Sequence, residues 1–214
     1  MEATAMITYW NQNATTILTD TAQHAQLVLT SLLIALLIAT LLILLCLRHD
    51  RLLTGLTYVF SLLYSVPSFA FFALLLPLTG LGDTTATVVL VVYSEYVLLR
   101  TFITGLRAID PSLVEVAYGM GMTSRQVFFK VQLPLATPAI FSGLQVALAS
   151  TMSIATIAAT INAGGLGNLL FEGLQTQQLP PLLWGIIMTV ALTLVSIAIL
   201  RILQHFLRPR FSTK

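Results

Sequence analysis

Few side chains in this 214-residue sequence could take part in catalysis. The histidines His24, His49 and His205 are far apart, and no pair of acids, or nucleophile with a base, recurs at a spacing that would bring it to one helix face. Cys46 is the only cysteine, so no disulfide can form within the chain. We therefore expect no catalytic residue and no metal site.

The run Gly164-Gly165-Leu166-Gly167 has the composition of a phosphate-binding loop. No lysine follows it, however, and a complete Gly-x-x-x-x-Gly-Lys-Ser/Thr motif occurs nowhere in the sequence. We therefore expect no bound cofactor and no ATP site in this chain. The glycines instead permit a tight turn or a close approach of another chain.

The elements that position these residues must be membrane helices. Only 8% of the residues are charged, 57% are hydrophobic and the mean hydropathy is +0.93, far from the balance of a soluble domain. A helix needs about 20 apolar residues to cross a bilayer, and the runs are too long for the alternating strands of a barrel. We expect an all-α membrane protein with five spans, at about 27–47, 52–78, 84–106, 138–161 and 182–203.

These spans form one membrane domain, 27–207. Residues 1–26 contain no Lys or Arg, lack the basic region of a secretory signal and are expected to form an exposed extracytoplasmic tail. Residues 208–214 are expected to form a short cytoplasmic tail. Within the second span, the missing N–H and the ring of Pro67 should kink the helix.

The charges fix the orientation, because five spans place the two termini on opposite sides. The bases outside the spans all fall in segments on one side: Arg48, Arg51, Arg107, Arg125, Lys130, Arg208, Arg210 and Lys214. By the positive-inside rule the N-terminus lies outside, the C-terminus and residues 107–137 lie in the cytoplasm, and the protein is a multi-pass component of the plasma or bacterial inner membrane. The net charge of +2 is too small to indicate a nucleic-acid partner.

Glu95 lies within an expected span, where a charge at the bilayer centre costs roughly 2.5 to 3.5 kcal/mol. It should face protein, water or Arg100, although a five-residue spacing is poor for an ion pair along one helix. Aromatic side chains of the second span, such as Tyr64 next to Pro67 and Ser68, could offer ring faces to a quaternary ammonium ion or could simply pack. For these four residues a translocation path, a subunit interface and plain structural polarity all remain open.

The connection 107–137 is long and amphipathic. Asp110 can cap a helix that begins at Pro111, and Thr123 or Ser124 can cap a second helix, which Pro134 should end. Gly119 and Gly121 lie between the two predicted helices and should separate them. The sequence therefore predicts a helix, a glycine turn and a helix at the cytoplasmic surface.

This connection resembles the EAA motif of ABC importer permeases, in which Glu-Ala-Ala is followed at fixed spacing by Gly and then by Ile-x-Leu-Pro. The matching residues here are Glu115-Val116-Ala117, Gly121 and Val131-Gln132-Leu133-Pro134. The resemblance implies the type I importer permease fold, with this segment docking on a cytoplasmic ATPase dimer that binds ATP and Mg. It assigns the coupling role to Glu115, Ala117, Gly119, Gly121, Leu133 and Pro134.

The same resemblance implies further partners: a second permease subunit, identical or related, and an extracytoplasmic solute-binding protein. Gly164, Gly165, Gly167 and Asn168 are then candidates for the loop that faces the binding protein. From about His24 to the end of the fifth span the chain is similar to permeases for glycine betaine, carnitine and choline, notably in Val66-Pro67-Ser68-Phe69-Ala70 and Gly119-Met120-Gly121-Met122-Thr123.

Three alternatives stay open on sequence alone. Amino-acid and methionine permeases share the EAA segment, so the solute could be an amino acid or another small molecule. A secondary transporter or channel would need intramembrane charge for ion coupling, for which only Glu95 and Arg100 are available. An intramembrane enzyme would have to use the scattered histidines.

Overall fold

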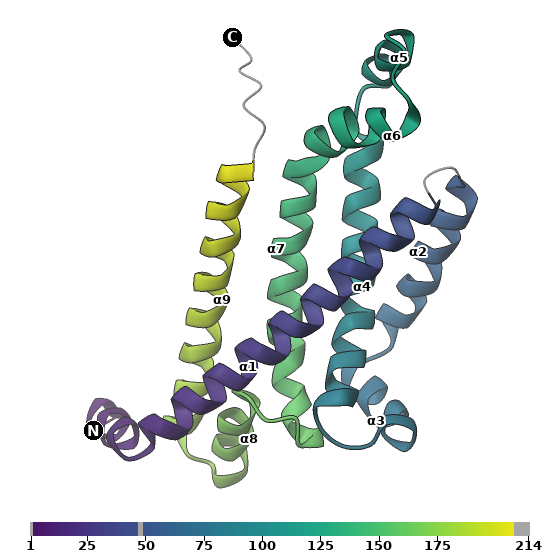
Figure 1. Cartoon of the computed structure of the whole chain (residues 1–214). Coiled ribbons are helices and arrows are strands. Elements are labelled where there is room, and N and C mark those ends of the chain that lie inside the picture. Colours follow the sequence, from purple (N-terminus) through teal and green to yellow (C-terminus); the bar gives the residue numbers. More distant parts are fainter. Residues whose placement is uncertain (1, 47–48, 208–214) are drawn as a thin grey trace.

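The computed structural model describes residues 2–46 and 49–207 and contains only helices and their connections over those residues (Figure 1). This confirms the expected all-α architecture. Arg48 and the expected tail 208–214 lie outside the described residues.

The first helix, α1, runs from Glu2 to Cys46. Residues 2–26 continue the first span as helix, so the segment that was expected to form a separate tail is part of α1. At about 1.5 Å per residue, 45 residues reach about twice the thickness of the hydrocarbon core. One face is buried in the chain at helical spacing, through Ile17, Asp20, His24, Leu27, Val28, Ser31, Leu32, Ala35, Ala39 and Ile43.

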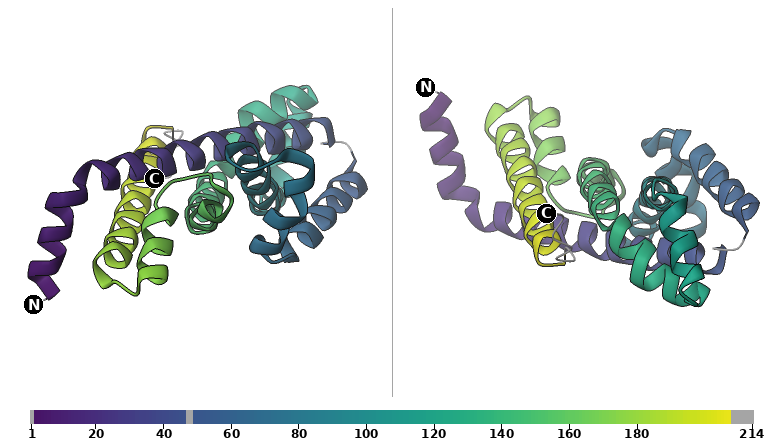
Figure 2. Two further views of the ribbon diagram at one scale, coloured as in Figure 1. Left: turned by 90° about the horizontal axis from the view of Figure 1, so that it is seen from below. Right: turned by 90° about the horizontal axis from the view of Figure 1, so that it is seen from above.

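The N-terminal part of α1 turns away from the line of the rest of the helix (Figure 2) and is held by the last two helices. The Trp184 Nε1–H donates to the carbonyl of Met6 at 3.1 Å, and the Tyr9 hydroxyl donates to the Glu172 carboxylate at 3.2 Å. The rings of Trp10 and Trp184 lie 4.6 Å apart between centroids. These contacts are the physical reason that the segment is not a free tail.

The second expected span is two helices, α2 (Asp50–Ser65) and α3 (Ser68–Thr79), which meet at an angle of 99°. The predicted kink at Pro67 is confirmed and is a complete break. The Tyr93 hydroxyl donates a hydrogen bond to the carbonyl of Val66 at this break. Backbone groups without a hydrogen-bond partner are costly in an apolar medium. Tyr93 therefore stabilises the break, because its hydroxyl pairs with the Val66 carbonyl where the regular helical hydrogen bonds are interrupted.

The core of the bundle is the pair α4 (Asp83–Arg107) and α7 (Leu133–Ile157). A Cβ on Gly143 would lie 2.1 Å from Thr101 Oγ1, and a Cβ on Gly105 would lie 2.5 Å from Ala139 Cβ. Further along, the hydroxyls of Ser94 and Thr151 are hydrogen-bonded at 2.9 Å. Small residues at four-residue spacing thus let the two backbones approach closely, as is typical of membrane helices.

After α7 the chain forms a short 3-10 helix, η2 (Ala158–Ile161), then α8 (Gly167–Thr176) and α9 (Leu179–Leu207). The sequence analysis did not predict α8. The most apolar window of α9 buries none of its residues within the chain, so this helix is left to contact lipid or another subunit.

Within residues 2–46 and 49–207, four helices are long and apolar enough to cross a membrane, and α2 with α3 makes a fifth if the bent pair counts as one span. Figure 1 shows α5, α6 and the C-terminal end of α9 at one end of the bundle, and α3, α8 and the N-terminus at the other. The first end holds the start of α2, with Arg51, and the end of α4, with Arg107, whereas α4 begins at Asp83 towards the second end. This placement agrees with the predicted orientation.

Substitution of Gly143 tests the α4–α7 contact. Gly143→Ala should destabilise the protein by about 1 to 3 kcal/mol, because the new methyl group overlaps Thr101 and the helices must separate. Gly55→Ala in α2 is the matched control, since its Cβ would meet nothing within 4 Å and alanine favours the helix. Thermal unfolding of the purified complexes in detergent should show a lower midpoint for the first variant only. Equal midpoints would contradict the packing described.

Substitution of Tyr93 tests the break between α2 and α3. Tyr93→Phe should cost about 1 to 3 kcal/mol, because the partly buried Val66 carbonyl loses its partner. Tyr58→Phe removes a hydroxyl from a ring that is 65% exposed and should change stability little. The same unfolding measurement compares the two, and a smaller loss for Tyr93→Phe than for Tyr58→Phe would refute the assignment.

Candidate functional site

The segment between α4 and α7 has the predicted helix, turn, helix form. The first helix, α5, runs from Pro111 to Gly119, and Asp110 Oδ1 accepts a 2.9 Å hydrogen bond from the backbone N–H of Ser112. Hydrogen bonds from the Ser112 backbone and hydroxyl lower the pKa of Asp110, because they stabilise the ionised carboxylate. The second helix, α6 (Ser124–Val127), begins with a capping box between Thr123 and Gln126. Both predicted caps are confirmed.

Gly121 closes α5 through a Schellman motif. Its N–H donates to the Tyr118 carbonyl at 2.9 Å, and the Met122 N–H donates to the Ala117 carbonyl at 3.2 Å. The φ of Gly121 is +80°, a conformation that a residue with a Cβ adopts only at a cost. Gly119 lies within the helix with no positive φ, so the turn requires only the second of the two glycines.

Pro134 does not end the second helix, which corrects the prediction. A π-helical turn, η1 (Phe128–Gln132), follows α6 and leads into α7, so the helix is continuous from Ser124 to Ile161. Pro134 lies in the first turn of α7, just after the wide hydrogen-bonding turn, where a missing N–H is tolerated. Leu133 begins that helix. Both residues therefore join the connection 107–137 directly to a membrane span.

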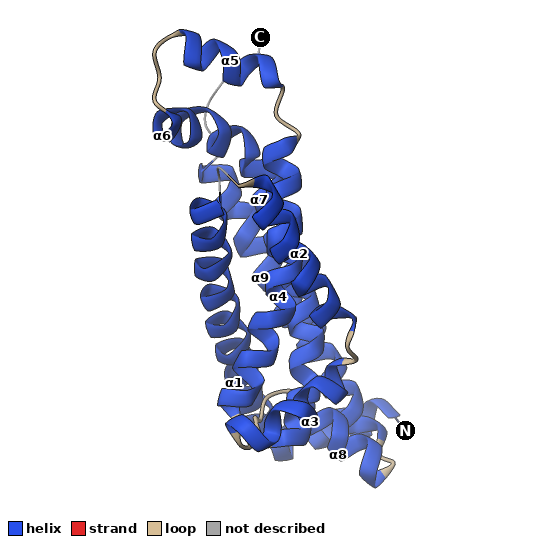
Figure 3. Ribbon diagram, turned by 90° about the vertical axis from the view of Figure 1, so that its right-hand side faces the viewer, coloured by secondary structure: helices blue, strands red, loops and turns tan. Residues whose placement is uncertain are grey.

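The surface of this segment is apolar although it projects from the bundle (Figure 3). Val116 is 61% exposed and Met120 is 77% exposed, and Glu115 is exposed beside them. Ala117 is buried beneath. A groove of about 320 Å³ is lined by Leu113, Val116, Ala117, Met120, Met122, Lys130, Val131 and Leu135. An exposed apolar groove of this kind is suited to burial against another protein.

The candidate pathway residues do not form one site. Glu95 is buried beside the backbone of Ala39 in α1, and neither carboxylate oxygen has a hydrogen-bond partner among the described residues. Of the options open at the sequence level, it faces protein. Arg100 points elsewhere, since its Nη1 donates to the Tyr96 hydroxyl at 2.7 Å.

Tyr64 belongs to an aromatic cluster between α2 and α4. Its ring centroid lies 4.8 Å from that of Tyr96 and 5.3 Å from that of Tyr93. Pro67 is exposed at the break, and Ser68 begins α3. Helix α4 thus presents Glu95 to α1 and its tyrosines to α2, which separates the two groups that the sequence analysis considered together.

The glycine-rich outer loop packs against α1. A Cβ on Gly165 would lie 3.0 Å from His24 Nδ1, one on Gly164 would lie 2.7 Å from Gln23 Oε1, and one on Gly167 would lie 2.0 Å from the Thr156 carbonyl oxygen. The glycines therefore allow close contacts between parts of this chain. Asn168 is exposed and also bonds inward, with its Nδ2 donating to Asp20 Oδ1 at 3.3 Å.

Sequence reasoning missed the partners of this loop on α1. Asp20, Gln23 and His24 lie at spacings of three and four residues, which was the available signal for a helical face in the supposed tail. His24 is fully buried, and its Nε2 lies 3.2 Å from the Met152 carbonyl oxygen. A polar helical face inside an apolar bundle needs polar partners, and the loop supplies them for Asp20 and Gln23, whereas α7 supplies one for His24.

The family model "Binding-protein-dependent transport system inner membrane component" matches residues 31–213. The chain belongs to this family. It is therefore a membrane-embedded permease subunit of an ABC importer. The match includes the coupling segment, the outer loop and every span beyond the first part of α1.

The permease is similar along almost its whole length to several characterised proteins. It is 34% identical to the osmoprotectant import permease OsmW of Salmonella typhimurium, over 95% of this chain and 97% of that protein. It is 31% identical to the carnitine transport permease OpuCB of Listeria monocytogenes, over 96% and 94% respectively. It is 29% identical to the choline transport permease OpuBB of Bacillus subtilis, over 95% and 94%.

Solved structures support the fold. A chain of the inward-facing MetNI methionine ABC transporter superposes with a TM-score of 0.76 at 17% identity, covering 87% of the permease and 94% of that chain. An amino acid ABC transporter crystallised with histidines also gives a TM-score of 0.76 at 17% identity, covering 94% and 96%. The permease therefore has the type I importer fold predicted from its sequence.

The turn at Gly121 can be tested by a graded series. Gly121→Val should reduce uptake most, Gly121→Ala less and Gly121→Asn least, because asparagine tolerates a positive φ best and a β-branched residue worst. A Cβ here would meet nothing within 4 Å in the chain, so the order reflects backbone strain of about 1 to 2 kcal/mol. Solute uptake per inserted complex is the measurement. An order that follows side-chain volume alone would argue against the Schellman turn as the cause.

Proposed function

We propose that this permease imports quaternary ammonium osmoprotectants such as glycine betaine, carnitine or choline. The observation that carries the proposal is its similarity, over nearly the full length of both chains, to permeases named for osmoprotectants, carnitine and choline. The structures named for methionine and amino acid transport are only 17% identical and support the fold alone. This favours an osmoprotectant over the amino-acid alternative.

ATP hydrolysis belongs to a separate cytoplasmic ATPase dimer, which uses ATP and Mg, while this chain binds no cofactor. Glu115, Ala117, Gly119, Gly121, Leu133 and Pro134 form the coupling segment in this proposal. The exposed apolar groove beside Val116 and Met120 supports it, because such a surface is stabilised when a partner covers it. Because the helix is continuous from Ser124 to Ile161, closure of the ATPase dimer would move α7 and, through its tight contact, α4.

Two permease subunits, identical or related, would enclose the path and alternate between outward and inward states. The α9 helix, whose apolar window is unburied within this chain, is available for such an interface. An extracytoplasmic binding protein would deliver solute to the end that carries α8 and Asn168. Gly164 and Gly165 shape that loop by packing it on α1, and Gly167 packs against Thr156 at the end of α7.

Of the pathway candidates, Tyr64 has the strongest support. It joins an aromatic cluster beside the break at Pro67 and Ser68, and aromatic faces bind quaternary ammonium ions. Glu95 is better suited to the α1–α4 contact, because it is buried within the chain.

Uptake by the assembled importer tests both parts of the proposal. Proteoliposomes holding the permease with its ATPase and binding protein should accumulate labelled glycine betaine, carnitine or choline when ATP is enclosed. Glu115→Lys, which reverses a charge on the exposed face of α5, should abolish uptake and the stimulation of ATP hydrolysis by loaded binding protein. Membrane insertion, measured by protease accessibility, should be unchanged.

Two results would refute the proposal. Uptake of an amino acid but of none of these three solutes would overturn the osmoprotectant assignment. Normal uptake by Glu115→Lys would overturn the coupling role of α5.

A further inference from the structure

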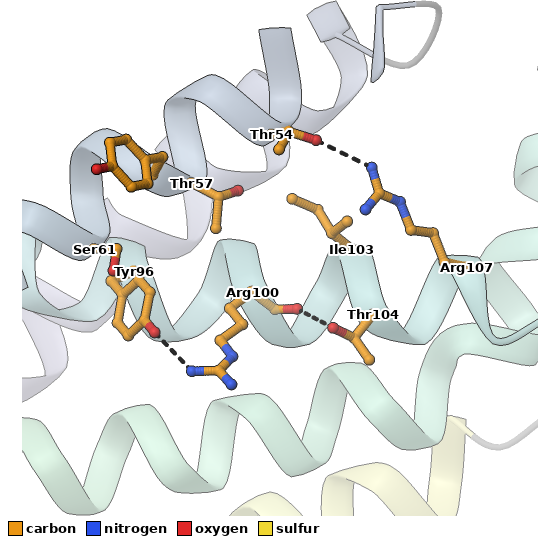
Figure 4. Close-up of a pocket in the computed structure, with 9 residues that line it drawn as sticks. Thr54, Thr57, Ser61, Tyr96, Arg100, Ile103, Thr104 and Arg107 are labelled. Atoms are coloured by element: carbon orange, nitrogen blue, oxygen red, sulfur yellow. Dashed lines mark hydrogen bonds between the residues drawn. The ribbon is translucent and has the colours of Figure 1, made fainter. Parts of the chain in front are cut away.

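A pocket with a mostly apolar accessible surface, but with two arginines among its lining residues, lies between α2 and α4 towards the cytoplasmic end of the bundle (Figure 4). Its volume is about 330 Å³. Hydroxyl-bearing and cationic residues predominate in its lining, which consists of Thr54, Thr57, Tyr58, Ser61, Tyr96, Arg100, Ile103, Thr104 and Arg107. None of these residues is acidic.

Arg100 is held in a defined position in this pocket. Its Nη1 donates to the Tyr96 hydroxyl at 2.7 Å, and its Cζ lies 5.8 Å from the Tyr96 ring centroid. Among the described residues it forms no ion pair with an acid, and a guanidinium carries five N–H donors. Arg107 enters the same pocket from the end of α4, where its Nη2 lies 3.4 Å from Thr54 Oγ1.

Two hydroxyl groups near Arg100 already donate hydrogen bonds within their own helices, so their protons are not offered to a ligand. Thr57 donates to the Leu53 carbonyl at 2.9 Å, and Thr104 donates to the Arg100 carbonyl at 2.7 Å, so each directs its proton to its own helix. Arg100 therefore offers the pocket several N–H donors and a positive charge, which favour an anionic group on a ligand.

This face of the molecule is unsuited to contact lipid. Arg100 and Thr104 are exposed on α4, and Thr57 and Ser61 face them from α2, so polar groups line both sides. Charged and polar side chains inside a span generally face protein or water. The pocket is therefore positioned to open onto the aqueous path or the second subunit.

We propose that this pocket binds the carboxylate of a zwitterionic solute at the cytoplasmic half of the path, with Arg100 as its main donor. This inference rests on the proposed function and deepens it. A carboxylate can accept two parallel hydrogen bonds from a guanidinium, and the nearby ring of Tyr58, 65% exposed, is available to the ammonium end. Glycine betaine and carnitine carry a carboxylate, whereas choline does not. Arg100 is thus a specificity-determining residue.

The test compares glycine betaine and choline uptake by the complete importer in proteoliposomes. Arg100→Gln should lower the ratio of glycine betaine to choline uptake about tenfold or more, the size expected for loss of one charge-assisted contact. Arg100→Lys should retain part of the ratio. Because the ratio does not depend on how much complex folds, a partly unstable variant still gives an answer. Arg201→Gln is the control and should leave the ratio unchanged. Arg201 is also a base towards the cytoplasmic end of the bundle, in α9, and among the described residues its side chain bonds only Gln145.

Each other outcome is decisive. An unchanged ratio in Arg100→Gln, or an equal loss of both solutes, would overturn the inference while leaving the proposed function intact. If the loss is equal and depends on the phosphatidylglycerol content of the vesicles, the pocket binds a lipid phosphate instead. If the wild-type importer takes up glycine betaine alone, normal uptake by Arg100→Gln overturns the carboxylate site, and a tenfold loss absent from Arg201→Gln supports it. A wild-type importer that takes up none of glycine betaine, carnitine and choline refutes both the proposed function and this inference.

Discussion

The close contact between α4 and α7 is the constraint on which the rest of this permease depends. The coupling segment is the connection between these two helices, so its position relative to the membrane is set by them. Glycine at 105 and 143 lets the backbones approach at positions where a methyl group would overlap Thr101 or Ala139. Without a hydrophobic driving force between helices in lipid, such van der Waals contact is a main source of stability. A motion imposed on the segment is therefore transmitted to two helices together.

Helix α4 contacts a different neighbouring helix on each of its faces. Glu95 faces α1, Tyr96 and Arg100 face α2, and Gly105 faces α7. Successive residues on a helix are about 100° apart, so neighbours in sequence contact different elements. The sequence grouped Glu95 with the aromatic residues of the second span, but the helix geometry separates them. Polar residues in one span thus contact different neighbouring helices on its different faces.

Much of the coupling segment could be predicted because its signals are local. A capping aspartate before Pro111, a Thr123 to Gln126 capping box and Gly121 at a positive φ each act within a few residues. The errors arose where distant contacts prevail. Residues 2–26 are helical because Trp184 and Glu172 hold them, and Pro134 sits in a continuous helix because a π-turn precedes it. No local pattern reports either partner.

The sequence by itself determined the membrane class, the number of apolar runs, the side on which the bases lie and the turn at Gly121, because hydropathy, charge and backbone conformation are properties of short stretches. Only the tertiary structure decided that the outer glycines pack on α1, that the second span breaks through 99°, and that Arg100 shares a pocket with residues of α2. These features depend on which helices come together. Close packing and the pairing of buried polar groups make that choice between residues far apart in the chain.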